Sequence, residues 1–94
     1  MIRHIVMWKF REGTQVQAEE FLTRLAALEG QISCIRAMSV RCSAVENSAF
    51  DAVLVADFDS LQDVSLYKND PRHLAVSALC KQIRTERSAI DFEV

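Results

Sequence analysis

Two histidines and one tyrosine are the side chains of this sequence best suited to proton transfer. His73 follows Asp70-Pro71-Arg72, and Asp and Pro are typical of a helix N-cap and first helical position, so His73 falls in the first turn of a predicted helix. The positive end of the helix dipole disfavours imidazolium, so we expect a neutral ring that accepts a proton near pH 7. Tyr67 precedes the helix break, and its hydroxyl group could donate to a carbonyl oxygen that gains enolate character.

The second histidine, His4, lies in an apolar segment at residues 2–10. Alternation places it on one face with Val6, Trp8 and Phe10, which we predict to be the face that helices cover. His4 would then reach the space next to the helices from the sheet. The Trp8 indole would project into that space as well, where it either stacks on a flat ligand or fills the cavity.

Further candidates surround the same predicted site. Phe21, Leu54 and Phe58 are expected to form its apolar walls as substrate-binding residues, with ordinary core packing as the alternative. Arg84 and Arg87 either recognise a carboxylate or phosphate group or remain exposed to solvent. The chemical candidates have structural interpretations too: the histidine at the helix start as a cap, the tyrosine as core, and the strand histidine as a buried, hydrogen-bonded side chain.

Composition narrows the function classes. The chain has 94 residues, which fits one domain spanning residues 1–94. It carries 11 basic and 13 acidic residues, a net charge of −2, so nucleic acid is not expected as a partner. The longest uninterrupted apolar stretch, residues 52–56, is far shorter than the roughly 20 residues of a membrane-spanning helix, so no membrane partner is expected.

Metal and redox sites are not indicated either. The three cysteines, Cys34, Cys42 and Cys80, are odd in number and contain no Cys-x-x-Cys pair, which is typical of small buried side chains in a reducing, cytoplasmic environment. The chain has only two histidines as further nitrogen ligands, so no convergent set of metal ligands is predicted. We therefore expect no metal and no cofactor.

The periodicity of apolar residues predicts the order strand, helix, strand, strand, broken helix, strand. This is the ferredoxin-like βαββαβ arrangement of the α+β class, an antiparallel sheet with helices on one face. The predicted strands span residues 2–10, 34–43, 50–58 and 87–94.

Capping sequences mark the predicted helix ends. Thr14 with Gln17, and Ser60 with Asp63, have the spacing of a capping box. Gly30 follows the first helical pattern and is a typical C-cap residue.

One face of the predicted sheet lacks a helical cover. Ile5, Met7, Val53 and Val55 line that face, and a bare apolar sheet surface would be a liability in water. The simplest way to bury it is against a second copy of the chain. We therefore predict a homodimer in which the two open sheet faces pack together.

The sequence resembles the stress-responsive dimeric α/β-barrel (Dabb) family along nearly its whole length. Residues 2–10 resemble the opening strand of that family with its early histidine, and residues 58–63 resemble its exit from the third strand. Residues 67–73 are similar to its tyrosine, proline and histidine signature, and residues 87–94 to its last strand. The resemblance implies a dimeric α+β barrel.

The family includes plant stress-induced proteins and olivetolic acid cyclase, which closes a linear polyketide by aldol chemistry. The resemblance implies a cavity between sheet and helices, with His73 as base, Tyr67 assisting and His4 nearby. The function predicted is that of a small homodimer that binds or converts an aromatic or polyketide-like carbonyl compound without a cofactor. The alternatives are a non-catalytic stress-associated dimer with its pocket filled by Trp8, and a cofactor-independent monooxygenase of the same superfold.

Overall fold

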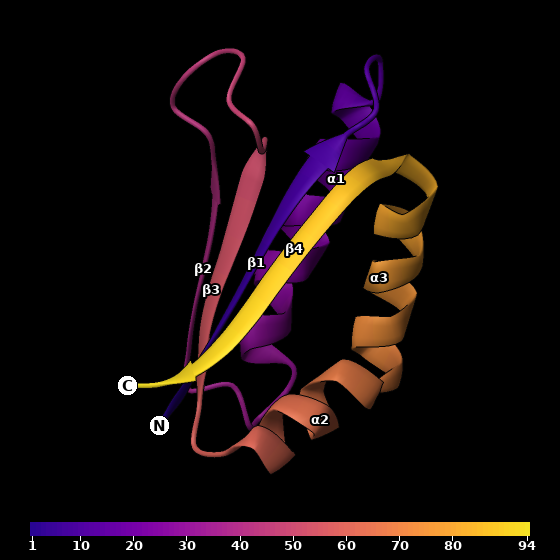
Figure 1. Cartoon of the computed structure of the whole chain (residues 1–94). Coiled ribbons are helices and arrows are strands. Elements are labelled where there is room, and N and C mark those ends of the chain that lie inside the picture. Colours follow the sequence, from indigo (N-terminus) through magenta and orange to yellow (C-terminus); the bar gives the residue numbers. More distant parts are fainter.

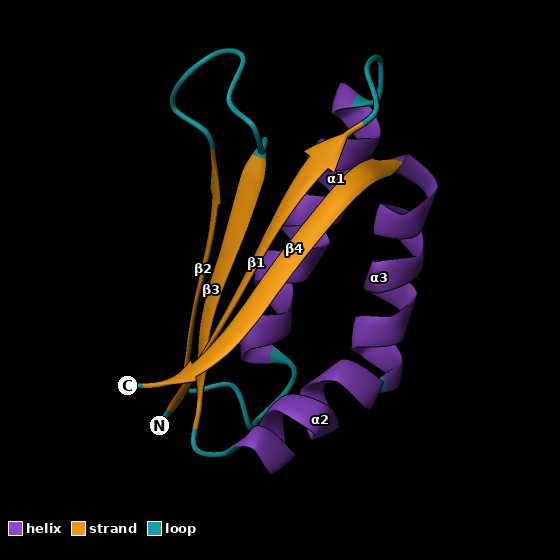
Figure 2. Cartoon of the chain, viewed as in Figure 1, coloured by secondary structure: helices purple, strands orange, loops and turns teal.

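Strands and helices separate into two layers in the computed structural model, which describes residues 1–94 (Figure 1). One layer is an antiparallel sheet of order β2-β3-β1-β4, and the helices lie on one of its faces (Figure 2). This is the ferredoxin-like α+β fold predicted from the periodicity. The elements are β1 (Ile2–Phe10), α1 (Gln15–Ala27), a 3₁₀ turn (Leu28–Gly30), β2 (Ala37–Cys42), β3 (Ala52–Phe58), α2 (Leu61–Asn69), α3 (Pro71–Ile83) and β4 (Arg84–Glu93).

Alternation along β1 decides which side chains meet the helices. His4, Val6 and Trp8 are buried, whereas Ile5 and Met7 between them are only half-buried. β3 alternates in the same way beside β1. The predicted orientation of His4 toward the helices is therefore confirmed, and the other face of the sheet remains open.

Two of the predicted caps form, one at the start of α2 and one at the break between α2 and α3. The Ser60 hydroxyl oxygen accepts a hydrogen bond from the backbone N–H of Asp63 at 3.1 Å. The Asp70 carboxylate accepts from the backbone N–H of Arg72 at 2.8 Å, and Pro71 occupies the first helical position. Asp70 and Pro71 fix where α3 begins and so place His73 in its first turn.

The caps predicted for α1 are wrong. The Thr14 hydroxyl group donates to the carbonyl oxygen of Arg11 at 2.5 Å, so it is committed to the preceding turn and makes no capping bond to Gln17. Gly30 does not adopt a positive φ, because α1 tightens into the 3₁₀ turn before the chain leaves the helix.

Strand boundaries differ from the prediction where turns compete with pairing. Residues 34–36 lie before β2, because the N–H of Ile35 bonds to the carbonyl oxygen of Ile32 in a turn. β3 begins at Ala52 rather than at residue 50. β4 begins at Arg84, three residues earlier than predicted, because this residue already pairs with Phe10 of β1.

None of the helices is long and apolar enough to cross a membrane.

Candidate functional site

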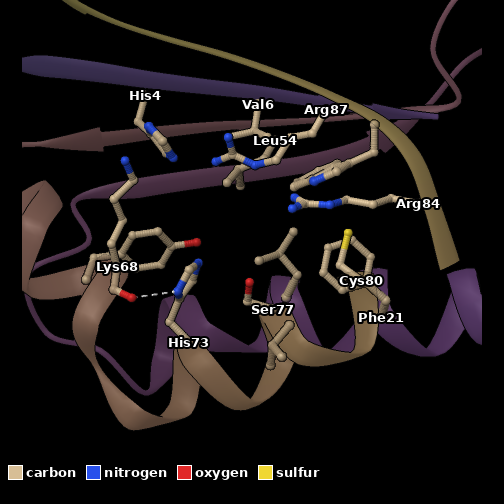
Figure 3. Close-up of a pocket in the computed structure, with 14 residues that line it drawn as sticks. His4, Val6, Phe21, Leu54, Lys68, His73, Ser77, Cys80, Arg84 and Arg87 are labelled. Atoms are coloured by element: carbon tan, nitrogen blue, oxygen red, sulfur yellow. Dashed lines mark hydrogen bonds between the residues drawn. The ribbon is translucent and has the colours of Figure 1, made fainter. Parts of the chain in front are cut away.

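A cavity of about 40 Å³ lies between the sheet and the helices, and all three helices and strands β1, β3 and β4 contribute to its wall (Figure 3). The structure brings together at this cavity every residue predicted for the site except Phe58. The lining residues are His4, Val6, Trp8, Phe21, Leu25, Leu54, Tyr67, Lys68, His73, Val76, Ser77, Cys80, Arg84 and Arg87.

Phe58 is not part of the wall, which corrects its predicted role. It is fully buried at the end of β3, and its ring centroid lies 5.2 Å from that of Tyr67 and 6.4 Å from that of His4. Phe58 therefore packs edge-on against the His4 ring and at a tilt against the Tyr67 ring, and it is not part of the cavity wall.

His73 has a defined tautomer. Its Nδ1 atom lies 3.0 Å from the carbonyl oxygen of Lys68, which can only accept a hydrogen bond, so Nδ1 carries the proton (Figure 3). In the neutral ring the remaining nitrogen, Nε2, then has a free lone pair. Burial lowers the pKa of His73, and the positive charges of Arg87 and Lys68 act in the same direction. The side chain is thus a neutral proton acceptor at pH 7.

His4 is held in the same tautomer by a partner that sequence reasoning missed. Its Nδ1 atom lies 2.6 Å from Oδ1 of Asp91, the residue directly opposite it on β4. Burial lowers the pKa of His4, and the hydrogen bond to Asp91 opposes this shift. A signal for Asp91 existed: with Ile90 and Phe92 on the open face, this carboxylate falls on the helix-covered face, where it requires a partner.

The hydroxyl group of Tyr67 has no hydrogen-bond partner, although the residue is 0% exposed. The ring centroid of Tyr67 lies 4.5 Å from that of His73 and 6.2 Å from that of His4. Burial raises the pKa of Tyr67 far above its ordinary value, so the phenol stays protonated and can donate. A buried polar group without a partner is rare in folded proteins and marks a place where a ligand could bind.

Replacement of Tyr67 by phenylalanine should stabilise the fold. The substitution Tyr67→Phe removes a buried hydroxyl group that gains no hydrogen bond, so the free energy of unfolding should rise by about 1 kcal/mol. Urea denaturation monitored by circular dichroism measures the change. A loss of stability would show that the hydroxyl group has a partner within the folded protein, contrary to this interpretation.

Stability should also depend on pH through the two histidines. Both have pKa values lowered by burial, so below pH ~6.5 the unfolded chain binds more protons than the folded one. The free energy of unfolding should therefore fall as the pH decreases from about 7 to about 5, before most carboxylates titrate. Thermal unfolding at fixed protein concentration tests this, and the His73→Asn variant should show a weaker dependence. An unchanged dependence in that variant would contradict the assignment.

Trp8 occupies much of the space between the layers. It is 5% exposed, and its ring meets that of Phe21 edge-on at a centroid distance of 5.2 Å. The indole therefore lines the cavity and also fills part of the space between sheet and helices, which contributes to the small size of the cavity. Cys80, also in the wall, is buried, and burial raises the pKa of its thiol to about 11, which agrees with a core role rather than that of a nucleophile.

Polar groups that were not predicted complete the lining. Lys68 and Ser77 face the cavity from α2 and α3, and Arg84 and Arg87, whose role the sequence left open, reach it from β4. No group of three or more His, Cys, Asp or Glu side chains comes together in the structure. The site thus combines two neutral imidazoles, one phenol and three cations.

Comparison with known families identifies the fold. The sequence model of the stress-responsive A/B barrel domain, Dabb, matches residues 2–94. The chain belongs to the Dabb family. The resemblance in the opening strand, the broken helix and the last strand is thereby confirmed. None of the curated protein sequences compared with this Dabb chain matches it.

Solved structures similar to this Dabb chain include two bacterial proteins described as dimeric, ferredoxin-like and of unknown function. The protein from Bacteroides fragilis is 28% identical, with a TM-score of 0.92 over 99% of this chain and 95% of that chain. The protein from Thermobifida fusca is 25% identical, with a TM-score of 0.87 over 99% and 90%. A hydroxynitrile lyase from Passiflora edulis shares 13% identity and a TM-score of 0.86 over 99% and 92%, a likeness of fold alone.

Proposed function

We propose that this Dabb protein is a cofactor-free acid–base enzyme for a carbonyl compound, with Nε2 of His73 as the general base. One observation carries the proposal: the hydrogen bond from Nδ1 of His73 to Lys68 leaves Nε2 as an unprotonated acceptor beside a cavity. The unpartnered Tyr67 hydroxyl group lies in the wall of the same cavity and supplies a donor.

The supported step is removal of a proton from the carbon next to a carbonyl group. Nε2 of His73 takes the proton, and the electron pair of the broken C–H bond forms the C=C bond of an enolate. The π electrons of the carbonyl group move to its oxygen, which accepts a hydrogen bond from the Tyr67 hydroxyl group. Return of the proton from Nε2 to carbon reverses the step, whereas attack of the enolate carbon on a second carbonyl group would form a C–C bond.

His4 is assigned a positioning role. The Asp91 carboxylate fixes its Nδ1–H, and the His4 ring packs at 6.2 Å from that of Tyr67. The cavity of about 40 Å³ is small compared with the ~300–1,000 Å³ of pockets for drug-sized ligands. An aromatic or polyketide-like substrate would therefore insert only its reacting end between Trp8, Phe21 and the polar groups.

Hydrogen exchange at carbon tests the proposal with a small, neutral probe. In D₂O at pD 7, the protein should catalyse exchange of the methyl hydrogens of 2,3-butanedione, measured by proton NMR. Free imidazole at the same concentration is the control, because it is the same base without a site. A rate no greater than that of imidazole would overturn the proposed function.

A second candidate function is a non-catalytic dimer whose pocket is filled by Trp8. The 5% exposure of this indole and the small cavity volume favour it. In that case the wild-type protein should neither exchange the hydrogens of 2,3-butanedione nor bind it, while the Trp8→Ala variant should bind benzene in the space vacated by the indole. Exchange by the wild-type protein would exclude this candidate.

We infer that the Dabb chain forms a homodimer through the open face of the sheet. The relatives from Bacteroides fragilis and Thermobifida fusca are described as dimeric. The predicted interface residues Ile5, Met7, Val53 and Val55 are half-buried on the face without helices, in the middle of the sheet. Burying this apolar face against a second copy would remove it from water.

A further inference from the structure

The wall of the cavity contains three cationic side chains and no acidic one. Lys68, Arg84 and Arg87 line the cavity, whereas the carboxylate of Asp91 is bonded to His4 and is not part of the wall. The chain as a whole has a net charge of −2, so this local excess of positive charge runs against its overall balance. We propose that the substrate is a small carbonyl compound that carries a carboxylate group, bound by Arg84, Arg87 and Lys68; this inference rests on the function proposed above.

None of the three cationic side chains forms an ion pair or a side-chain hydrogen bond within the protein. The ion pairs of the structure involve Arg3, Arg24, Arg36, Arg72 and His4 besides the N-terminus, and none includes a cavity cation. The hydrogen bonds of the side chains leave the same three groups without a partner. Their charges therefore remain available to a ligand.

A β-bulge brings the two arginines to the same side. Lys9 of β1 pairs with Glu86, but Phe10 pairs with Arg84, so Thr85 is an extra residue in β4. Without this irregularity Arg84 and Arg87, separated by an odd number of positions, would point to opposite faces of the strand. Figure 3 shows the side chains of both arginines extending from β4 into the cavity region, with the Lys68 amine near His4.

The ligand class follows from the donors and the space. Arginine guanidinium groups present paired N–H donors whose planar geometry matches a carboxylate. A cavity of about 40 Å³ has room for only a few non-hydrogen atoms, so the reacting end of a compact acid suits it better than an extended anionic group. Arg87 is the common element: its side chain lines the cavity, its positive charge contributes to the lowered pKa values of His4 and His73, and it opposes the burial that raises the pKa of Tyr67.

A bound carboxylate would also tune the base. The charged or titratable groups near His73 are Asp70 at the N-cap of α3, Tyr67 and Lys68 from α2, Cys80 from α3, His4 from β1, and Arg84 and Arg87 from β4. Because Lys68 and Arg87 depress the pKa of His73, neutralising them with an anion should raise it. The substrate would then strengthen the base that acts on it.

Binding of matched probes tests the inference. Pyruvate and 2,3-butanedione share a methyl ketone and differ in that a carboxylate replaces an acetyl group. Isothermal titration calorimetry at low salt should show pyruvate binding at least about tenfold more tightly than 2,3-butanedione. It should also be tighter than inorganic phosphate. Equal affinity for pyruvate and 2,3-butanedione would overturn the inference, and so would preferential binding of phosphate, which would indicate a phosphorylated ligand.

Neutral variants connect the affinity to the cations. Arg84→Gln and Arg87→Gln should each weaken pyruvate binding about tenfold, a clearly larger loss of affinity than the same variants show for 2,3-butanedione. Lys81→Gln removes an exposed charge outside the cavity and should change neither. By NMR, pyruvate should raise the pKa of His73 in the wild-type protein and not in Arg87→Gln. An equal effect of all three substitutions would contradict a specific carboxylate site.

The two proposals fail in different ways. Exchange of 2,3-butanedione hydrogens without preference for pyruvate would support the acid–base function and overturn the carboxylate site. Arginine-dependent binding of pyruvate without exchange of either probe would support the carboxylate site as a binding site and overturn the acid–base function.

Discussion

His73→Asn should reduce the rate of hydrogen exchange on 2,3-butanedione by about 10²–10⁴-fold, the usual contribution of a positioned general base. Asparagine places an amide N–H near the position of Nδ1, so the hydrogen bond to the Lys68 carbonyl oxygen, 3.0 Å long in the wild-type protein, can be retained. It has no counterpart of Nε2. The variant therefore removes the proton acceptor and keeps the local structure at the start of α3.

Chemical rescue separates this role from a structural one. His73→Ala leaves a space beside the Tyr67 ring, which packs at 4.5 Å from the imidazole, and added imidazole should restore part of the exchange rate. The Lys81→Gln variant, with its substitution on the exposed side of the same helix, should retain wild-type activity. If His73→Asn exchanges at the wild-type rate, His73 is not the base. If both variants unfold, as far-ultraviolet circular dichroism would reveal, His73 is a structural cap and the proposal fails.

The fold was predictable because its signals are local and repeated. Alternation over residues 2–10 and the Asp70-Pro71 helix start depend on neighbours in the chain, and both are confirmed. The failed cap at Thr14 has the same kind of signal, but its hydroxyl group had a competing acceptor in the preceding turn, the carbonyl oxygen of Arg11. Capping patterns state which bonds a side chain can make, and the turn geometry decides between them.

The positions of Asp91, Arg84 and Arg87 at the site depend on the register between strands, which local sequence patterns do not reveal. Asp91 meets His4 through the register of β1 and β4, two elements at opposite ends of the sequence. The convergence of Arg84 and Arg87 needs, in addition, the extra residue of the bulge. Sequence alternation alone would separate these two arginines, and the sequence left open whether they recognise an anion or remain exposed to solvent. The size of the cavity depends on how the Trp8 ring packs, and spacing carries no information on that.

The open face of the sheet is the surface through which we expect two copies of the chain to associate. Ile5 lies at the centre of this face, since both Val55 of β3 and Ile90 of β4 are its direct cross-strand partners. Ile90 is 60% exposed and Phe92 is 40% exposed. Exposure of several large apolar side chains on one face is unfavourable in water. The pair Arg3–Asp57, with a 2.8 Å N···O distance, lies on the same face beside this apolar centre. An apolar centre next to a charged pair is the usual composition of an interface between protein subunits.

Ile5→Lys should therefore prevent the proposed dimer from forming and leave a monomer. A lysine at this position would be buried without a partner when two faces meet, at a cost of about 3–5 kcal/mol, which weakens association by roughly 10²–10⁴-fold. Light scattering coupled to size exclusion should give twice the 10.6 kDa chain mass for the wild-type protein and a single chain mass for the variant. Leu66→Lys, at an exposed leucine on α2, is the matched control and should stay dimeric.

A second substitution distinguishes loss of the interface from unfolding of the Ile5→Lys variant. Ile90→Lys changes a side chain that is already 60% exposed on an edge strand, so the isolated subunit should tolerate it, and it should dissociate the dimer as well. Because Ile5 and Ile90 lie on the face opposite the cavity, a folded monomer should still bind pyruvate in the site between sheet and helices. A wild-type monomer at micromolar concentration, or a dimer that survives both substitutions, would show that the chain does not associate through this face.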